Sequence, residues 1–188
     1  MIKEYYYENG GKVDNSKLQT GKIPLEDYKI VHKGSIICCH DVFITYNNGI
    51  LLVIRDNLPA KDVLWPIGGK IQRGFPIEES LKKKALEECG LELSNLINLG
   101  ISRTTFQTDP FEHGKGTDSL NVAYFAVGKG RLKLDNLHKN PVIIVPKGTK
   151  IEEIRKDVES IEYTDTLKEK LEPYVRDFLE LAITFLKG

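Results

Sequence analysis

The chain has 188 residues, which is enough to bury one core and too few for two ordinary domains, so we predict a single domain over residues 1–188. Lys plus Arg and Asp plus Glu both number 27, and this balance argues against the basic surface of a protein that coats nucleic acid. No segment approaches the roughly 20 apolar residues of a membrane span, and no targeting signal opens the chain. We expect a soluble cytoplasmic protein without nucleic-acid or membrane partners.

The first part of the chain predicts an arm, a helix and a hairpin. Residues 1–23 are polar and form either a loose arm or a short hairpin, and 24–34 form a short helix with Pro24 near its start. Residues 35–46 and 50–56 are apolar strands joined by the tight turn 47–49. Residues 63–69 form another short strand.

The central segment contains the most strongly predicted helix, 77–89. Its apolar residues recur at helical spacing, and Gly90 follows as a C-terminal cap. Strands are expected at 96–108 and 119–128. The polar segment 109–118 between them is either a lid or recognition loop, or a solvated connection.

The last part of the chain predicts strands at 131–135 and 142–145, then helices at 150–158 and 166–187. Pro173 begins a new helical segment or kinks the second helix. Cys38, Cys39 and Cys89 are odd in number and lack CxxC spacing, so we expect reduced, buried thiols rather than a disulfide or zinc site.

One carboxylate on the central helix lies where an apolar side chain is expected. Glu88 is seven residues after Leu81 and three after Ala85, so it falls within the apolar stripe. A buried carboxylate requires a cation, hydrogen-bond donors or an altered pKa. Glu87 is rotated away from this stripe, as a solvated charge paired with Lys83 or as a further metal ligand.

These features together resemble the Nudix box, a loop–helix–loop motif that binds divalent metal against nucleoside diphosphate derivatives. The matching residues are Gly68, Gly69, Gly74, the helix, Glu87, Glu88, Gly90 and Leu91. The resemblance implies an α+β fold, an α/β/α sandwich around a mixed β-sheet. It also implies Mg²⁺ or Mn²⁺ held by Glu88, the Gly68 carbonyl and Glu87.

The box departs from the family pattern at two carboxylates. The loop glutamate of the family aligns with Phe75, and its Arg-Glu pair aligns with Lys83 and Lys84. Two explanations stay open. Either fewer metal ions bind, with Glu88 and the Gly68 carbonyl as the remaining ligands, or Lys84 itself supplies a cation.

Segments 25–49, 55–72 and 114–127 are similar to the GDP-mannose mannosyl hydrolase branch of this superfamily, so the resemblance covers roughly residues 25–145. We therefore divide the predicted domain into an arm (1–23), a core (24–146) and C-terminal helices (147–188). In that branch water attacks the anomeric carbon of the sugar with inversion, and the nucleoside diphosphate leaves. The resemblance also implies a homodimer.

Three residues match catalytic positions of the branch. Asp41 matches an aspartate on the first strand, and Arg55 matches an arginine that assists the leaving diphosphate. His138 is the best match for the histidine that serves as general base in a late loop, with His113 as a rival. The metal-binding glutamine expected before that histidine is Leu137 here.

Three functions follow from the sequence. The first is hydrolysis of a nucleotide sugar, such as a GDP-mannose-like compound, to sugar and nucleoside diphosphate. The second is conventional cleavage between the phosphates of a nucleoside diphosphate derivative. The third is a catalytically silent domain that binds a nucleotide ligand or a partner, which Phe75, Lys84 and Leu137 together favour.

Overall fold

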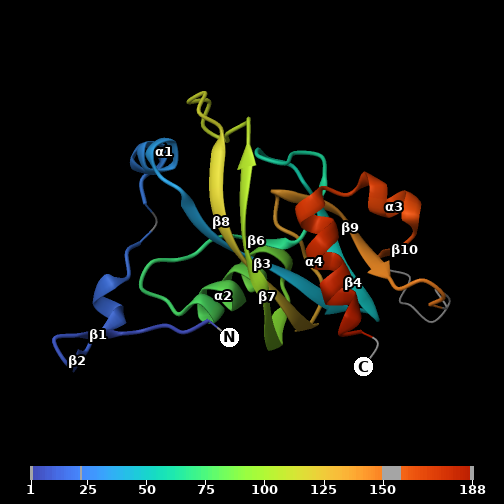
Figure 1. The fold of residues 1–188 in the computed structure, drawn as a ribbon, viewed down its shortest axis with the longest axis horizontal. Coiled ribbons are helices and arrows are strands. Elements are labelled where there is room, and N and C mark those ends of the chain that lie inside the picture. Colours follow the sequence, from blue (N-terminus) through green and yellow to red (C-terminus); the bar gives the residue numbers. More distant parts are fainter. Residues whose placement is uncertain (1, 22, 150–157, 187–188) are drawn as a thin grey trace.

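The computed structural model describes residues 2–21, 23–149 and 158–186. The N-terminal segment forms a short hairpin, which is one of the two alternatives predicted from the sequence. A 3₁₀ helix and the predicted first helix follow it (Figure 1). These elements are β1 (Tyr7–Glu8), β2 (Gly11–Lys12), η1 (Asn15–Leu18) and α1 (Leu25–Gly34). Within the described residues, no helix is long and apolar enough to cross a membrane.

The centre of the molecule is a mixed eight-stranded sheet in the order β10-β9-β4-β3-β8-β7, with β5 on β4 and β6 on β3. The β3–β8 and β10–β9 pairs are parallel, and the other pairs are antiparallel. The strands are β3 (Ile37–Tyr46), β4 (Gly49–Arg55), β5 (Leu64–Trp65), β6 (Ile67–Lys70), β7 (Glu92–Phe106), β8 (Thr117–Lys129), β9 (His138–Val145) and β10 (Glu159–Glu162).

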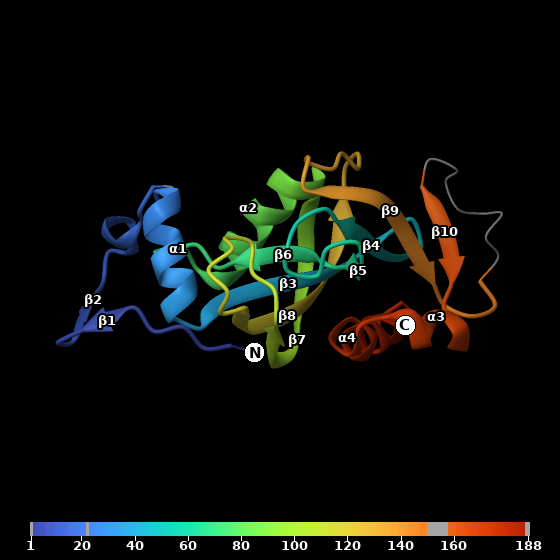
Figure 2. The same cartoon turned by 90° about the horizontal axis from the view of Figure 1, so that it is seen from above.

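Helices cover the two faces of this sheet, as Figure 2 shows. On one face α2 (Ile77–Cys89) packs Leu81, Ala85 and Cys89 against the even-numbered side chains of β3. On the other face α4 (Pro173–Thr184) packs its apolar stripe against the opposite side of the same strands. The alternation of side chains along each strand produces this division. The expected α/β/α sandwich is confirmed.

Most predicted elements are confirmed, including the 47–49 turn and the helix that ends at Gly90. Gly90 has φ 71°, a left-handed conformation that favours glycine. Pro173 begins a separate helix after the short α3 (Asp165–Lys170), which is the first of the two alternatives predicted for this proline. Most of the predicted helix 150–158 lies outside the described residues.

The predicted strand 131–135 is wrong. The amides of Lys133 and Asp135 instead donate to the carbonyls of Cys89 and Glu88, at 3.0 and 2.9 Å. The segment satisfies the free carbonyls at the C-terminal end of α2, so these amides do not join a sheet ladder. Strand β9 begins at His138, earlier than expected, and β10 was not predicted from the sequence.

The three cysteines are free, as expected. Cys38 is exposed, however, whereas the sequence predicted that all three thiols are buried. The two neighbours on β3 point to opposite faces because side chains alternate along a strand. Cys39 is partly buried on the face of β3 that carries Asp41, and burial raises the pKa of its thiol to about 12.

Strand β3 changes its pairing partner along one edge, and the candidate site lies at this change of partner. Residues 39–42 of β3 pair with β6, and residues 44–46 pair with β4 on the same edge. The end of β4 instead pairs with β5 and β9. The carboxyl end of β4 and the amino half of β3 therefore border a space between the sheet and the surrounding loops.

The fully buried His40 ties β3 to α2. Its Nε2 lies 2.8 Å from Ser80 Oγ, which accepts a 2.9 Å hydrogen bond from the Gln72 amide. Since the Ser80 hydroxyl is an acceptor there, its own proton is available to His40 Nε2. Burial lowers the pKa of His40 to about 4, because the charged ring loses its hydration.

We expect this histidine to make the fold acid-sensitive. An unfolded histidine binds a proton near pH 6.5, so stability is present above that pH and is lost as pH falls towards about 4. The lost free energy of unfolding is about 3 kcal/mol. Urea unfolding at pH 7 and pH 4.5 measures it. His40→Gln should lack this part of the pH dependence. If the free energy of unfolding changes equally with pH in the wild type and in His40→Gln, the assignment is contradicted.

Candidate active site

A cavity of about 410 Å³ lies beside the split edge of β3. Its wall combines β3, the end of β4, β6, the C-terminal half of α2, and the start of β9. This size is typical of a pocket for a small organic ligand. Its charged and titratable lining residues are Tyr28, His32, Cys39, Asp41, Arg55, Lys70, Lys84, Glu88 and His138.

His138 is held in one orientation by a carboxylate. Its Nδ1 lies 2.8 Å from Asp135 Oδ1, which also accepts a 2.9 Å hydrogen bond from the Leu137 amide. The carboxylate favours a proton on Nδ1, which leaves Nε2 as the acceptor nitrogen. His138 is buried at the start of β9, whereas the sequence placed it in a loop. The geometry suits a general base.

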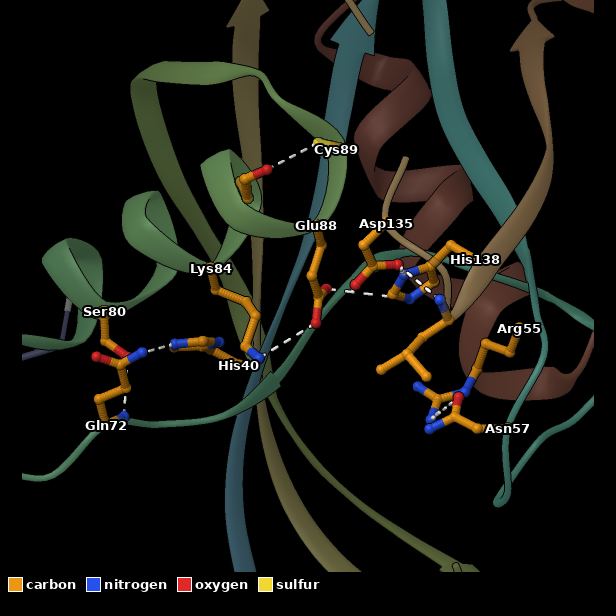
Figure 3. A network of polar contacts seen from close by, with 12 residues as sticks. His40, Arg55, Asn57, Gln72, Ser80, Lys84, Glu88, Cys89, Asp135 and His138 are labelled. Atoms are coloured by element: carbon orange, nitrogen blue, oxygen red, sulfur yellow. Dashed lines mark hydrogen bonds and ion pairs between the residues drawn. The ribbon is translucent and has the colours of Figure 1, made fainter. Parts of the chain in front are cut away.

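The acceptor nitrogen of His138 faces Glu88 on α2 (Figure 3). The Nε2 to Glu88 Oε2 distance is 4.0 Å, too long for a direct hydrogen bond. Glu88 Oε2 is buried and has no hydrogen-bond partner among the described residues. Burial raises the pKa of Glu88, while the nearby Lys84 and His138 oppose that rise.

The other oxygen of Glu88 is paired with a lysine of the same helix. Lys84 Nζ lies 3.2 Å from Glu88 Oε1, and both side chains are largely buried. Lys84 also lies against the loop, since a Cβ added to Gly69 would be 3.8 Å from Nζ. The i,i+4 spacing brings the two side chains together. The Glu88 carboxylate predicted within the apolar stripe is therefore compensated by Lys84.

Asp41 is buried between β6 and the C-terminal helix. The Tyr174 hydroxyl donates to its Oδ2 at 2.7 Å. A Cβ on Gly68 would lie 2.2 Å from Asp41 Oδ1, so the aspartate occupies space that only glycine leaves free. Burial raises the pKa of Asp41 to about 6, against the opposing effects of Tyr174 and Arg55.

Two further cations border the cavity without a carboxylate partner. Within the described part of the chain, neither Arg55 nor Lys70 has a carboxylate oxygen within 4.0 Å. Arg55 donates to Asn57 Oδ1 at 3.3 Å, and its buried Nε has no partner among the residues that the structure describes. Lys70 Nζ lies 4.3 Å from the ring centroid of Tyr28. Burial, and then Lys84, lowers the pKa of Lys70.

Aromatic side chains line two further parts of the cavity. Trp65 and Phe106 make an edge contact at 5.8 Å between ring centroids, and Tyr28 and Phe111 make another at 5.3 Å. The first pair comes from β5 and β7, and the second joins α1 to the loop 107–116. Such flat apolar walls are suited to a ring of a ligand, such as a nucleobase.

The oxygen donors around Glu88 and Gly68 match the requirements of a divalent cation poorly. Mg²⁺ takes six oxygen donors and usually uses one or two carboxylates with substrate phosphates. Glu88 offers one carboxylate, and its Oε1 is already paired with Lys84. A divalent ion 4 Å from an ammonium group is repelled by about 8 kcal/mol at an effective dielectric constant of about 20. Over the described ranges no three His, Cys, Asp or Glu side chains form a metal site. With Lys84 paired to Glu88 Oε1, these donors do not fit a divalent ion. Metal binding by Glu88, the Gly68 carbonyl and Glu87 stays a prediction from the resemblance.

The structure brings most predicted site residues together. Asp41, Arg55, Gly68, Glu88 and His138 all border the cavity. Two predicted candidates do not. Glu87 is exposed on the outer face of α2, and His113 lies outside the lining, with its Nε2 2.8 Å from His32 Nδ1.

Sequence reasoning missed Asp135, Lys70 and Tyr174. Asp135 could have been found, because a carboxylate three residues before a candidate base is visible in the sequence. Lys70 directly follows the Gly68–Gly69 pair, so it too could have been found from the sequence. Tyr174 lies 133 residues after Asp41, and no local pattern connects the two.

Comparisons with known proteins give a fold but no family model that matches the chain. The MutT protein of Methanosarcina mazei is 16% identical, with a TM-score of 0.51 over 81% of this chain and 96% of that one. The chain has the Nudix fold. A MutT Nudix hydrolase of Burkholderia pseudomallei is 19% identical, with a TM-score of 0.48 over 57% and 81% of the two chains. The low-salt glycan biosynthesis protein Agl8 of Haloferax volcanii is 23% identical over 68% of this chain and 82% of its own length.

The Nudix fold accounts for the place of the cavity. The loop–helix–loop predicted from Gly68 to Leu91 consists of β6, the turn through Gly74, α2 and the Gly90 cap. It presents Lys84 and Glu88 to the cavity from one side. His138 reaches the same cavity because the segment after β8 caps the end of this helix.

Proposed function

We propose that the protein hydrolyses a nucleotide sugar by attack of water on the anomeric carbon of the sugar. One observation carries this proposal. His138, oriented by Asp135, directs its acceptor nitrogen at Glu88 Oε2, which lies 4.0 Å away and has no hydrogen-bond partner among the described residues. The Arg55 guanidinium group lines the same cavity. The released products are the sugar, with inverted configuration, and a nucleoside diphosphate.

The attacking water is placed between His138 and Glu88. The two facing acceptors can each take one hydrogen bond from the same water, whose free lone pair then points into the cavity. As the new bond forms between the water oxygen and the anomeric carbon, one proton passes to His138 Nε2. The bond from that carbon to the diphosphate oxygen breaks, and its electron pair leaves with the diphosphate.

The cations of the cavity can support cleavage at carbon. Negative charge then develops on the departing diphosphate oxygen, where Arg55, Lys70 and Lys84 can stabilise it. Asp41 remains a predicted catalytic residue. Its contact with Tyr174 and Gly68 supports a role in shaping the wall, and its charge can stabilise the cationic sugar of the transition state.

The aromatic walls support a nucleotide as the other end of the ligand, while the base stays open between purine and pyrimidine. The glycan biosynthesis named for the Haloferax volcanii relative is in keeping with a sugar-containing substrate. Residues 1–188 as one domain, a homodimer, and a cytoplasmic location stay predictions.

The Lys84–Glu88 pair also favours one alternative function, a silent domain that binds nucleotide without hydrolysis. A pair that is complete without a ligand is what a protein without turnover would keep. Conventional cleavage at phosphorus is the remaining alternative.

Isotope labelling distinguishes these functions. A panel of nucleotide sugars, including GDP-mannose, is incubated in oxygen-18 water, and products are identified by mass. We expect the heavy oxygen in the released sugar and none in the phosphate product. Label on phosphorus would establish conventional cleavage, and binding of a nucleotide without any turnover would establish the silent domain.

A further inference from the structure

We propose that Lys84 takes the place of a metal ion, and that Lys84, Lys70 and Arg55 bind the diphosphate group of the ligand without a divalent cation. This inference rests on the proposed function for the class of ligand. It goes beyond that function because it assigns the recognition of the diphosphate to three side chains.

The position of Lys84 carries the first step. Its ammonium group lies between the Glu88 carboxylate, 3.2 Å away, and the Gly68–Gly69 loop. These are the two groups at which the sequence predicted a metal. Figure 3 shows Lys84 directed at Glu88 from the side opposite His138. A monovalent cation already compensates the buried carboxylate, so no metal is needed to keep it charged.

The second step concerns two positively charged side chains of the cavity wall that form no salt bridge among the described residues. Arg55 and Lys70 line the cavity and lack carboxylate partners within 4.0 Å among the described residues. The buried Nε of Arg55 also has no acceptor in the described part of the chain. Asp41 and Glu88 act on Arg55 from more than 4.0 Å, so its guanidinium group and the Lys70 ammonium group can still contact an anionic ligand directly. A diphosphate provides several acceptor oxygens on two adjacent phosphoryl groups, which suits a guanidinium and two ammonium groups.

The third step concerns Glu88. One of its oxygens is paired with Lys84, and the other faces His138 and has no hydrogen-bond partner within the described ranges. The carboxylate can therefore hold Lys84 towards the diphosphate and accept a hydrogen bond from water at the same time. A metal ligand at this position would have to give up one of these roles.

Titration calorimetry with inorganic pyrophosphate tests the proposal without any assumption about the base or sugar. We expect pyrophosphate to bind the wild-type protein in EDTA. Lys84→Gln should weaken this binding about tenfold or more, because a charge-assisted contact is lost. Lys84→Arg should retain most of it. The matched control is Lys82→Gln on the exposed face of the same helix, which should bind as the wild type does.

A second measurement follows the metal directly. Free Mn²⁺ gives a paramagnetic resonance signal that is lost on binding, and we expect the wild-type protein to leave this signal unchanged. Pyrophosphate binding that requires Mg²⁺, or Mn²⁺ binding that Glu88→Gln abolishes, would overturn the proposal. Absence of pyrophosphate binding in both buffers would also overturn it. Failure of the proposed function looks different: pyrophosphate binds in EDTA, while no nucleotide sugar is hydrolysed.

Discussion

His138→Ala is expected to lower kcat about a thousandfold, within the range for loss of a general base. The variant removes the nitrogen that accepts the proton of water, while the cations that bind the diphosphate stay in place. KM should therefore change little. Single-turnover measurements with the nucleotide sugar that the panel identifies would separate the chemical step from product release.

The rival base provides the matched control for this experiment. His113 is a histidine of the same chain, but it lies outside the cavity and is engaged with His32 at 2.8 Å. His113→Ala should leave kcat near the wild-type value. If His113→Ala has the larger effect, the base has been assigned to the wrong residue. Asp135→Asn should slow turnover less than His138→Ala, because it disturbs the orientation and tautomer of a base that is still present.

Arg55→Ala is expected to lower kcat about a hundredfold, which corresponds to loss of one transition-state contact of about 3 kcal/mol. The guanidinium matters most when the diphosphate gains charge, so kcat should fall more than the affinity for substrate. Arg55→Lys should recover part of the rate, because charge is kept and the planar fork is lost. Steady-state kinetics of the three proteins would measure this.

Arg103 offers a control of the same residue type. It pairs with Asp118 at 2.6 Å on the surface, and its side chain is 58% exposed. Arg103→Ala should leave kcat unchanged, since exposed salt bridges contribute little. If kcat of Arg55→Ala decreases by much less than a factor of ten, Arg55 is instead a structural residue at the end of the strand.

The local elements of this fold could be predicted from the sequence. The helix 77–89 has apolar residues at helical spacing and a glycine cap, and the hairpin around residues 47–49 has two apolar runs and a turn. These signals depend on residues within a few positions of each other, so they survive without knowledge of the tertiary structure. The same helical spacing placed Glu88 within the apolar stripe.

The interactions of the Glu88 carboxylate could be predicted only in part from the sequence. Lys84 is four residues earlier on the same helix, and the sequence could name it as a possible cation. The sequence left open whether it or a metal compensates Glu88. The structure shows the ammonium group 3.2 Å from Glu88 Oε1, because the i,i+4 spacing places both side chains on the same face of the helix.

Only the tertiary structure decided how the segment 131–138 is used. Its alternating apolar residues indicated a strand, but its amides bond to the last carbonyls of α2. Those carbonyls have no partner within the helix, so a nearby chain that satisfies them competes with a sheet ladder. This contact brings Asp135 and His138 to Glu88. The sequence by itself determined which residues could be acid, base and cation, and the packing of segments distant in the chain decided which of them share one cavity.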